Sequence, residues 1–417
     1  MSRTFVRSRA LAVLSGSLWR SACTATAPRA PRAAGPGSGS TTPEAVPGER
    51  AVPYGDLRAP DANGLALAQG FTSRVVGRSG HRVGGVTWHA APGGGGCFPD
   101  GDGWIYVSNS AVPLLGGVSA VRFEPDGTIG SGYRILSGTD LNGAGGATPW
   151  QTWLSGETTS HGRLFECDPY GQRAAMPRLA MGQFRHEGAT CDPDRGVVYL
   201  TEDEPDGCFY RFRPDDWGDL TTGTLEVMAG SPDRAAVTWK RVPNPVAMFE
   251  PVREQVAGAR RFNGGEDCHY SEGFCYFTTR GDSRMWAYDA ANDRITVLYD
   301  GCAEPYGPEG RIRDAAPGGT TSGPEHGTKH DMECDSEHDT VVRWGDAYVA
   351  EDEGVMEITV ISPGGVAERF LRVEGHERSQ ITGLAFSPDG SRLYFSSQWG
   401  GEGVGGITYE VSGPFRG

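Results

Sequence analysis

The sequence predicts an all-β fold arranged as a six-bladed β-propeller, and three observations lead to that prediction. The 417 residues include 63 glycines and 28 prolines, a content that suits short strands joined by turns and not a helical bundle. Hydrophobic residues make up 37% of the chain and aromatic residues 10%, so a packed core can form. A strand–turn–strand unit also recurs six times between residues 103 and 411, which is typical of a ring of repeated sheets.

Each repeat consists of an apolar, aromatic strand, a short turn rich in Gly, Asp and Glu, and a second alternating strand. The six aligned aromatic positions are Tyr106, Trp153, Tyr199, Tyr276, Tyr348 and Tyr394. Three of the five spacings are about 46 residues, the size of a four-stranded blade, and the other two contain insertions near 215–260 and 300–340. A β-sandwich would not require such repetition. Because one blade cannot bury its own faces, the ring must close, and we expect residues 48–90 to pair with the last blade.

The start of the chain differs in composition from the rest. Residues 1–43 contain six arginines and no acidic residue, and a stretch rich in Ala, Pro, Gly and Ser continues to Pro47. A basic start, a weakly apolar middle and a tail of small residues are typical of an export signal, here a degenerate twin-arginine-like leader. We therefore expect a leader and linker at 1–47, a single propeller at 48–417, and export to the periplasm or the medium. If the leader is not functional, the protein is cytoplasmic.

The charge and the cysteines disfavour several classes of partner and site. The net charge is −15, and an acidic surface repels nucleic acid and anionic membranes. No apolar run is long enough for a helix that spans a membrane. The nine cysteines include no CxxC pair and are mostly expected to be buried, with one or two disulfides left open for an exported protein. We expect a monomer.

Acidic residues recur where the blades begin and where the aromatic strands, taken as the innermost strands, end. Six-fold geometry brings such positions together at the central channel. Carboxylates gathered there repel each other unless a hard cation neutralises them, with calcium favoured and magnesium or ferric iron as alternatives. The other interpretation is that these acids are solvated turn residues. The candidate metal ligands are Glu157, Glu187, Glu202, Asp203, Glu266, Glu351 and Asp352.

Several unusual strings occur in a fixed order along the chain. They are found at residues 142–155, 184–187, 198–203, 348–352 and 382–390. In these strings the sequence resembles the PhoX-type alkaline phosphatase family, and the similarity runs from about residue 60 to the C-terminus. The resemblance implies a six-bladed propeller, export by the twin-arginine route, and hydrolysis of phosphate monoesters with iron and calcium in the channel.

Four positions depart from the family pattern near the expected metal pocket. The pattern has a cysteine, an iron ligand, where this chain has Gly143, and it has another cysteine at Gly156. Relatives carry Glu where this chain has Ala111 and Gln380. Loss of the thiolate removes the ligand that best supports iron, whereas the remaining oxygen ligands suit calcium. The resemblance with these departures therefore implies calcium more than iron.

Two functions of different classes follow. In the first, the protein is a metal-dependent phosphoesterase: a multi-carboxylate metal cluster polarises the phosphoryl group of a small phosphorylated substrate. Arg185 and Arg280 are then the predicted phosphate-binding, catalytic residues. In the second, the protein is a calcium-bound or metal-free propeller that is catalytically impaired and binds a ligand without turnover. Other propeller hydrolases, such as lactonases, are a lesser alternative.

Overall fold

The structure, a computed structural model, describes residues 54–300, 340–343, 346–351, 354–362, 367–402 and 405–416. The chain divides into two compact units, Met1–Ala51 and Val52–Gly417, and every described residue belongs to the second unit. The predicted leader and linker at 1–47 lie outside the described residues, as does most of the insertion near 300–340. All statements below concern the second unit.

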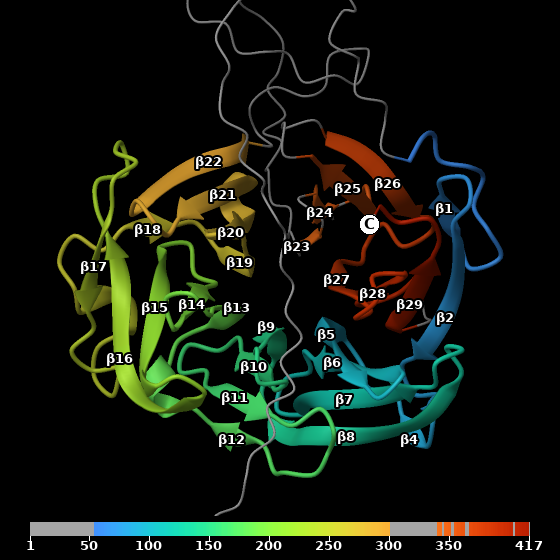
Figure 1. The fold of residues 1–417 in the computed structure, drawn as a ribbon, viewed down its shortest axis with the longest axis horizontal. Helices are drawn as coiled ribbons and strands as arrows, with labels where there is room; N and C mark the ends of the chain where they lie inside the picture. Colours follow the sequence, from blue (N-terminus) through green and yellow to red (C-terminus); the bar gives the residue numbers. More distant parts are fainter. Residues whose placement is uncertain are drawn as a thin grey trace, which may run out of the picture. The chain divides into compact units, whose positions relative to one another are not determined.

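The described residues form six antiparallel sheets around a common axis, so the predicted six-bladed β-propeller is confirmed (Figure 1). Blade 1 consists of β5 (Pro92–Asp100), β6 (Gly103–Ser110), β7 (Gly116–Phe123) and β8 (Ile129–Thr139). Blade 2 consists of β9 (Asn142–Ala147), β10 (Trp153–Glu157), β11 (Leu164–Cys167) and β12 (Met176–Pro177). Blade 3 consists of β13 (His186–Asp192), β14 (Val197–Glu202), β15 (Gly207–Asp216), β16 (Asp219–Ala229) and β17 (Thr238–Arg241), and β18 (Arg261–Phe262) pairs with β15.

The other three blades follow the same antiparallel order. Blade 4 consists of β19 (Gly265–Ser271), β20 (Phe274–Thr279), β21 (Arg284–Asp289) and β22 (Arg294–Asp300). Blade 5 consists of β23 (Thr340–Arg343), β24 (Asp346–Glu351), β25 (Glu357–Ile361), β26 (Ala367–Val373) and β1 (Leu65–Leu67). Blade 6 consists of β27 (Ile381–Phe386), β28 (Arg392–Ser397), β29 (Ile407–Ser412) and β2 (Thr72–Arg78).

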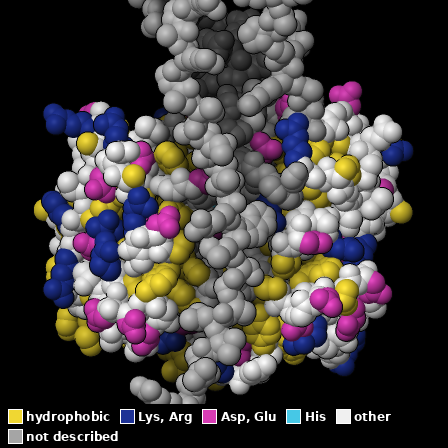
Figure 2. Space-filling view, in the orientation of Figure 1, with side chains coloured by type: hydrophobic (Ala, Val, Ile, Leu, Met, Phe, Trp, Pro, Cys, Tyr) yellow, Lys and Arg dark blue, Asp and Glu magenta, His cyan; other side chains and the backbone are white. Residues whose placement is uncertain are grey.

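Short elements complete the described part of the chain. They are the hairpin β3 (Arg82–Val83) and β4 (Val86–Thr87), and the 3₁₀ helices η1 (Leu179–Met181), η2 (Val252–Glu254) and η3 (Arg280–Asp282). None of the helices in the described ranges is long and apolar enough to cross a membrane. The face seen in Figure 2 carries acidic and basic side chains interspersed with hydrophobic ones.

The ring is closed by the N-terminal part of the unit. β2 pairs with β29, from Thr72 opposite Ser412 to Arg78 opposite Ile407, and supplies the outer strand of blade 6. The expectation that residues 48–90 pair with the last blade is confirmed for β2, whereas β1 adds to blade 5. Such closure joins the first and last parts of the unit and leaves no unpaired gap between the end blades.

Hydrophobic clusters fill the junctions between neighbouring blades within the described residues. Between blades 3 and 4, the rings of Phe209 and Phe277 stack with centroids 4.4 Å apart. Between blades 6 and 1, the rings of Tyr394 and Tyr106 stack at 4.8 Å. Alternation along each strand puts apolar side chains on both faces, so each blade packs against two neighbours.

The aligned aromatic strands occupy the second place in each blade, and the expectation that they are innermost is wrong by one strand. The innermost strands are β5, β9, β13, β19, β23 and β27, which contact each other around the axis (Figure 1). Two of them are glycine-rich because their backbones approach closely: a Cβ on Gly94 would lie 2.6 Å from Cα of Ala144 in the next blade. Glycine runs have low strand propensity, which hid these strands in the sequence.

Candidate functional site

One face of the ring gathers the residues that begin the innermost strands and those that follow the second strands. These positions meet because the two strands are antiparallel, so one begins where the other ends. A cavity of about 380 Å³ opens there. Its lining contains five of the nine predicted site residues: Arg185, Glu187, Asp203, Glu266 and Arg280.

Two arginines from neighbouring blades pair with one carboxylate in this cavity. Arg185, before β13, donates from Nε to the Asp203 carbonyl oxygen at 2.8 Å and from Nη2 to Asp203 Oδ2 at 2.9 Å. Arg280, after β20, donates to Asp203 Oδ1, and its Nη1 lies 3.3 Å from Glu266 Oε1. The Asp203 side chain is 6% exposed, whereas those of Arg185 and Arg280 are 36% and 29% exposed. The guanidinium groups are therefore oriented by a buried acid but remain accessible from the cavity.

Glu187 lies over Gly143 of the neighbouring blade. The Thr158 hydroxyl donates to Glu187 Oε2 at 2.7 Å, and it also lies 3.0 Å from the His186 carbonyl oxygen. A Cβ on Gly143 would lie 2.5 Å from Glu187 Oε1 and 2.5 Å from the Thr158 hydroxyl. The Glu187 carboxylate thus fills the space beside Gly143, where the family resemblance implies a cysteine.

Acids outnumber bases on the cavity wall. Glu187, Asp203, Glu266 and Asp267 line it together with the guanidinium groups of Arg185 and Arg280. Four carboxylates against two guanidinium groups leave an excess of negative charge in a partly enclosed space. A cation in the cavity would lower the repulsion among the carboxylates.

The wall formed by blades 6 and 1, with Leu141 just before blade 2, is mostly apolar. Its apolar members are Ala111, Pro113, Leu141, Ile381 and Trp399. The side-chain amides of Gln380 and Gln398 and the hydroxyl of Thr382 interrupt it. The Trp399 side chain is 50% exposed, and its backbone amide donates to the Ser379 hydroxyl at 2.9 Å. Ala111 and Gln380, which stand where the resemblance implies glutamates, both belong to this wall.

Glu202, a predicted metal ligand, does not line this cavity. Its carboxylate is fully buried and accepts from the Tyr210 hydroxyl at 2.7 Å, the Cys208 amide at 3.0 Å and Arg253 Nη1 at 3.2 Å. Burial raises the pKa of Glu202 to about 7, although Tyr210 and Arg253 favour the ionised form. Its contacts hold the 203–207 turn and η2 against the blade.

Glu157, a second predicted metal ligand, also has a supporting place outside the cavity lining. Its Oε2 accepts from Arg163 Nε at 2.9 Å and from the Arg163 amide at 3.0 Å. Its Oε1 accepts from the Asp140 amide at 3.1 Å, and Asp140 Oδ1 accepts from the Leu114 amide at 2.8 Å. Glu157 therefore holds the 140 turn, which in turn holds the 111–115 loop at the cavity.

The structure does not describe the side chains of the last two predicted ligands, Glu351 and Asp352. The backbone of Glu351 ends β24, in register with Glu357 of β25. The Glu351 side chain and the whole of Asp352 lie outside the described residues. Both therefore stay predictions.

The donors that line the cavity suit one of the two metals implied by the resemblance and not the other. An iron centre with a thiolate does not fit, because Gly143 offers no ligand and the Glu187 carboxylate fills the adjacent space. A hard divalent cation fits the donor chemistry, since Glu187, Glu266 and Asp267 offer only oxygen atoms. Among the residues that the structure describes, no three His, Cys, Asp or Glu side chains are already gathered as a metal site.

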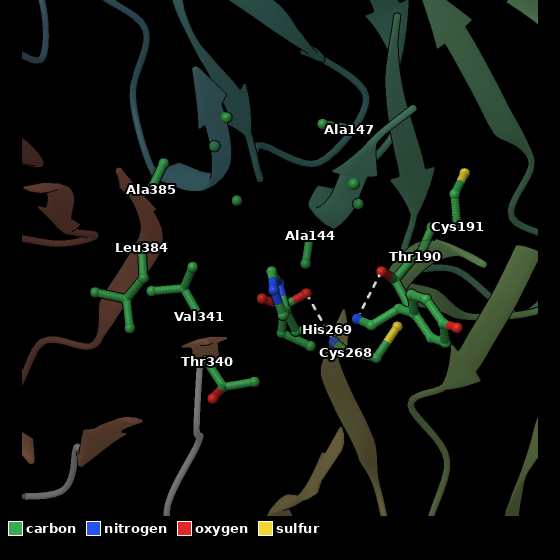
Figure 3. Close-up of a pocket in the computed structure, with 18 of the residues that line it drawn as sticks. Ala144, Ala147, Thr190, Cys191, Cys268, His269, Thr340, Val341, Leu384 and Ala385 are labelled. Carbon is green, nitrogen blue, oxygen red and sulfur yellow. Dashed lines mark hydrogen bonds between the residues drawn. The ribbon is translucent and has the colours of Figure 1, made fainter. Parts of the chain in front are cut away.

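A second cavity of about 760 Å³ lies along the channel, between the innermost strands. Figure 3 shows Ala144, Thr190, His269 and Val341 around it, and the Tyr270 amide donates to the Thr190 hydroxyl at 3.0 Å. Burial and the nearby charge of Arg343 lower the pKa of His269 to about 4, so this imidazole is neutral at pH 7. Gly94, Ala144 and Asp267 line both cavities, which are therefore neighbours along the axis.

Sequence reasoning did not single out Thr158, Asp267, Gln398 and Trp399, although all four line the smaller cavity. A positional signal could have found two of them. Thr158, Asp203, Arg280 and Gln398 each come directly after the second strand of a blade. Counting forward from the aligned aromatics to the strand end identifies these positions without any charge pattern.

Residues 156–304 match the family model described as alkaline phosphatase PhoX. This stretch contains every charged residue of the cavity wall, from Arg185 to Arg280. The resemblance to the PhoX family predicted from the sequence is confirmed by this match. No curated protein matches the sequence.

The propeller fold is shared with a solved structure. PhoX of Pseudomonas fluorescens in complex with vanadate, a transition state analogue, superposes with a TM-score of 0.63 at 16% identity, over 87% of this chain and 97% of that chain. A gluconolactonase of Xanthomonas campestris superposes with a TM-score of 0.49 at 12% identity, over 87% and 99%. The first superposition supports the propeller fold independently of sequence similarity.

Proposed function

We propose that the protein is a calcium-dependent phosphoesterase of the PhoX type and that the smaller cavity binds a phosphate monoester. The observation that carries this proposal is the meeting of Arg185 and Arg280, from adjacent blades, beside a set of carboxylates in one cavity. Planar guanidinium groups bind phosphoryl oxygens through paired, charge-assisted hydrogen bonds. The family match over residues 156–304 supports the same chemistry.

The residues of the cavity divide the work of binding. Arg185 and Arg280 bind the phosphoryl oxygens, and Asp203, which is nearly buried, keeps both guanidinium groups in a fixed direction. Such prior orientation lowers the entropic cost of ligand binding. Glu187, Glu266 and Asp267 would hold calcium, and one divalent cation would bring the four carboxylates and two guanidinium groups of the cavity wall to zero net charge. When bound, calcium supplies a Lewis acid for the phosphoryl group and acidifies a bound water.

A second candidate function is phosphate-ester binding without turnover. It is favoured by Gly143, which removes the expected thiolate, and by Glu187, which fills the neighbouring space. In this case the same arginines bind the ligand but no nucleophile is activated.

Metal content and turnover measured together decide between the two functions. Purified protein is analysed for metals, and phosphate release from phenyl phosphate is followed with calcium and after EDTA treatment. We expect calcium without iron, and release that depends on calcium and is lost in Arg280→Gln. The control is Arg284→Gln, because Arg284 pairs with Asp282 and Asp300 and does not line the cavity. Calcium and phosphate binding with no release would support the second function.

We also propose that the protein is exported. The arginine-rich, acid-free start and the small-residue stretch that follows it support this proposal. An export reporter fused after residue 47 should reach the periplasm or the medium. The same reporter with Arg3, Arg7 and Arg9 replaced by Gln should stay inside, and equal export of both would contradict the proposal.

A further inference from the structure

The walls of the smaller cavity differ in chemistry according to the blades that build them. Blades 3 and 4 contribute the charged wall, with Arg185, Glu187, Asp203, Glu266 and Arg280. Blades 6 and 1, with Leu141 just before blade 2, contribute the apolar wall described above. A ligand that touches both walls must therefore carry charge at one end and apolar surface at the other.

We infer that the preferred substrates are phosphate monoesters of apolar alcohols, with the alcohol part against Trp399 and Pro113. This inference rests on the proposed function, because the arginines must first hold the phosphoryl group on the opposite wall. The alcohol part of the ester, which is the leaving group, therefore defines the substrate class. Esters of sugars or glycerol would place hydroxyl groups against a wall that offers few hydrogen-bond partners.

Trp399 has the largest side chain of the apolar wall. Its indole is half exposed, whereas its backbone is fixed through the buried Ser379, whose hydroxyl accepts from the Trp399 amide. The backbone N–H of the adjacent Gln398 donates to the backbone carbonyl oxygen of Gln380 at 2.9 Å. This bond ties the turn to the start of β27. A large aromatic ring that is held in place yet uncovered at a cavity offers contact area at low entropic cost.

The 111–115 loop borders the same wall and keeps its apolar side chains out of the core. Leu114 has a φ of 58°, a strained conformation for a residue with a side chain, and its side chain is 77% exposed. The Asp140 carboxylate holds this conformation through the Leu114 amide. Leu115 beside it is 73% exposed. Strain that is kept without any gain in burial points to a role at the cavity mouth.

The polar members of the apolar wall set a limit on the ligand. The Thr382 hydroxyl donates to the Pro92 carbonyl oxygen at 2.7 Å, so it is already engaged. The side-chain amides of Gln380 and Gln398 remain, and they offer too few hydrogen-bonding groups for a polyhydroxylated chain. The cavity volume, about 380 Å³, accommodates a phosphate and a ring of phenyl size.

Matched ligands test the inference in the calcium-loaded full-length protein. Calorimetry compares n-propyl phosphate with glycerol 3-phosphate, which share a three-carbon chain and a phosphate and differ by two hydroxyl groups. We expect n-propyl phosphate to bind about tenfold more tightly, and phenyl phosphate more tightly again. Inorganic phosphate, titrated in parallel, reports on the charged wall and its calcium without the apolar wall.

Variants assign the preference to the wall. Trp399→Ala should weaken phenyl phosphate binding about tenfold and leave inorganic phosphate binding unchanged, while Trp399→Phe should restore most of the loss. Phe249→Ala is the control, because Phe249 is 94% exposed and does not line the cavity. Melting temperatures confirm that each variant is folded.

The possible results distinguish a failure of this inference from a failure of the proposed function. Equal affinities for n-propyl phosphate and glycerol 3-phosphate, or a preference that Trp399→Ala does not change, would overturn the inference while inorganic phosphate binding keeps the proposed function. Absence of inorganic phosphate binding would overturn both.

Discussion

Arg280 and Asp203 form an ion pair that joins blade 4 to blade 3 at the edge of the cavity. Each residue comes directly after the second strand of its blade, so the pair repeats one structural position in two neighbouring blades. Asp203 also accepts from Arg185, which precedes the innermost strand of its own blade. The result is a fixed pair of guanidinium groups whose spacing is set by the packing of two blades.

Removal of Arg280 should weaken phosphate binding more than it weakens the fold. Arg280→Gln leaves Asp203 paired with Arg185, so the loss in unfolding free energy should be about 1 kcal/mol. Phosphate affinity should fall about tenfold to a hundredfold, because one charge-assisted contact is lost. Calorimetry with inorganic phosphate and a urea denaturation curve measure the two effects. An unchanged affinity would remove Arg280 from the binding site.

Much of the architecture is predictable from the sequence because the second strands carry aromatic residues at regular spacing. The innermost strands of blades 1 and 2 have no strand pattern in the sequence, because residues 92–97 and 142–147 are at least half glycine. The alignment of the six aromatic positions is also off by one residue between some blades. Tyr106 and Trp153 lie four residues before the ends of their strands, whereas Tyr199 and Tyr276 lie three before. A one-residue difference turns the side chain to the other face of the sheet.

The site was predictable only in part, for reasons of local geometry. Glu202 and Asp203 are adjacent in the sequence, yet alternation points the first into the blade and the second to the cavity. No pattern of charge distinguishes them. Glu157 likewise has the sequence position of a ligand, but Arg163 and the Asp140 amide occupy its oxygen atoms. The apolar wall has no charge signal and emerges only when blades 6 and 1 meet.

Glu157 and Glu187 are both predicted metal ligands, but their replacement by glutamine should have different effects on calcium content and on stability. Glu187→Gln should reduce bound calcium, because Glu187 lines the cavity. Glu157→Gln should leave calcium content unchanged but lower the unfolding free energy by about 2 kcal/mol, because the buried Glu157 carboxylate loses its charged contacts to Arg163. Elemental analysis and urea denaturation of both variants provide the comparison. Equal calcium loss in the two would show that Glu157 also belongs to the metal site.

The N-terminal boundary of the fold should lie between the leader and β1. Deletion of residues 1–53 should leave the melting temperature unchanged, since β1 and β2 are retained. Deletion of residues 1–80 should prevent folding, because β2 supplies the outer strand of blade 6. Circular dichroism and thermal melting distinguish the two truncated proteins. A stable fold in the longer deletion would contradict the closure described here.

Stability should fall on the acid side partly because of His89. Burial, and then the charge of Arg134, lower the pKa of His89 from 6.5 to about 3, and the neutral ring contacts the Ser119 hydroxyl at 2.9 Å. A lowered pKa means that the unfolded chain takes up the proton first. The stabilisation is therefore complete above pH 6.5 and is lost as the pH falls toward 3. Between pH 7.5 and pH 5, protonation of His89 in the unfolded chain should lower the free energy of unfolding by about 2 kcal/mol.

The matched variant His89→Gln isolates that contribution. It cannot gain a proton in this range, so its unfolding free energy should decline less steeply between pH 7.5 and pH 5 than that of the unaltered protein. Urea denaturation at four or five pH values measures both slopes. Parallel slopes would mean that His89 takes no part in the acid-side loss.

In the proposed site, the cavity holds a phosphoryl group between its arginines and a calcium ion. Calorimetric titration of inorganic phosphate into calcium-loaded and into EDTA-treated protein measures this binding. We predict one site per chain in the calcium-loaded protein, much weaker binding after EDTA treatment, and loss of that site in Arg280→Gln. Absence of phosphate binding in the calcium-loaded protein, or binding that neither EDTA nor Arg280→Gln changes, would contradict the account.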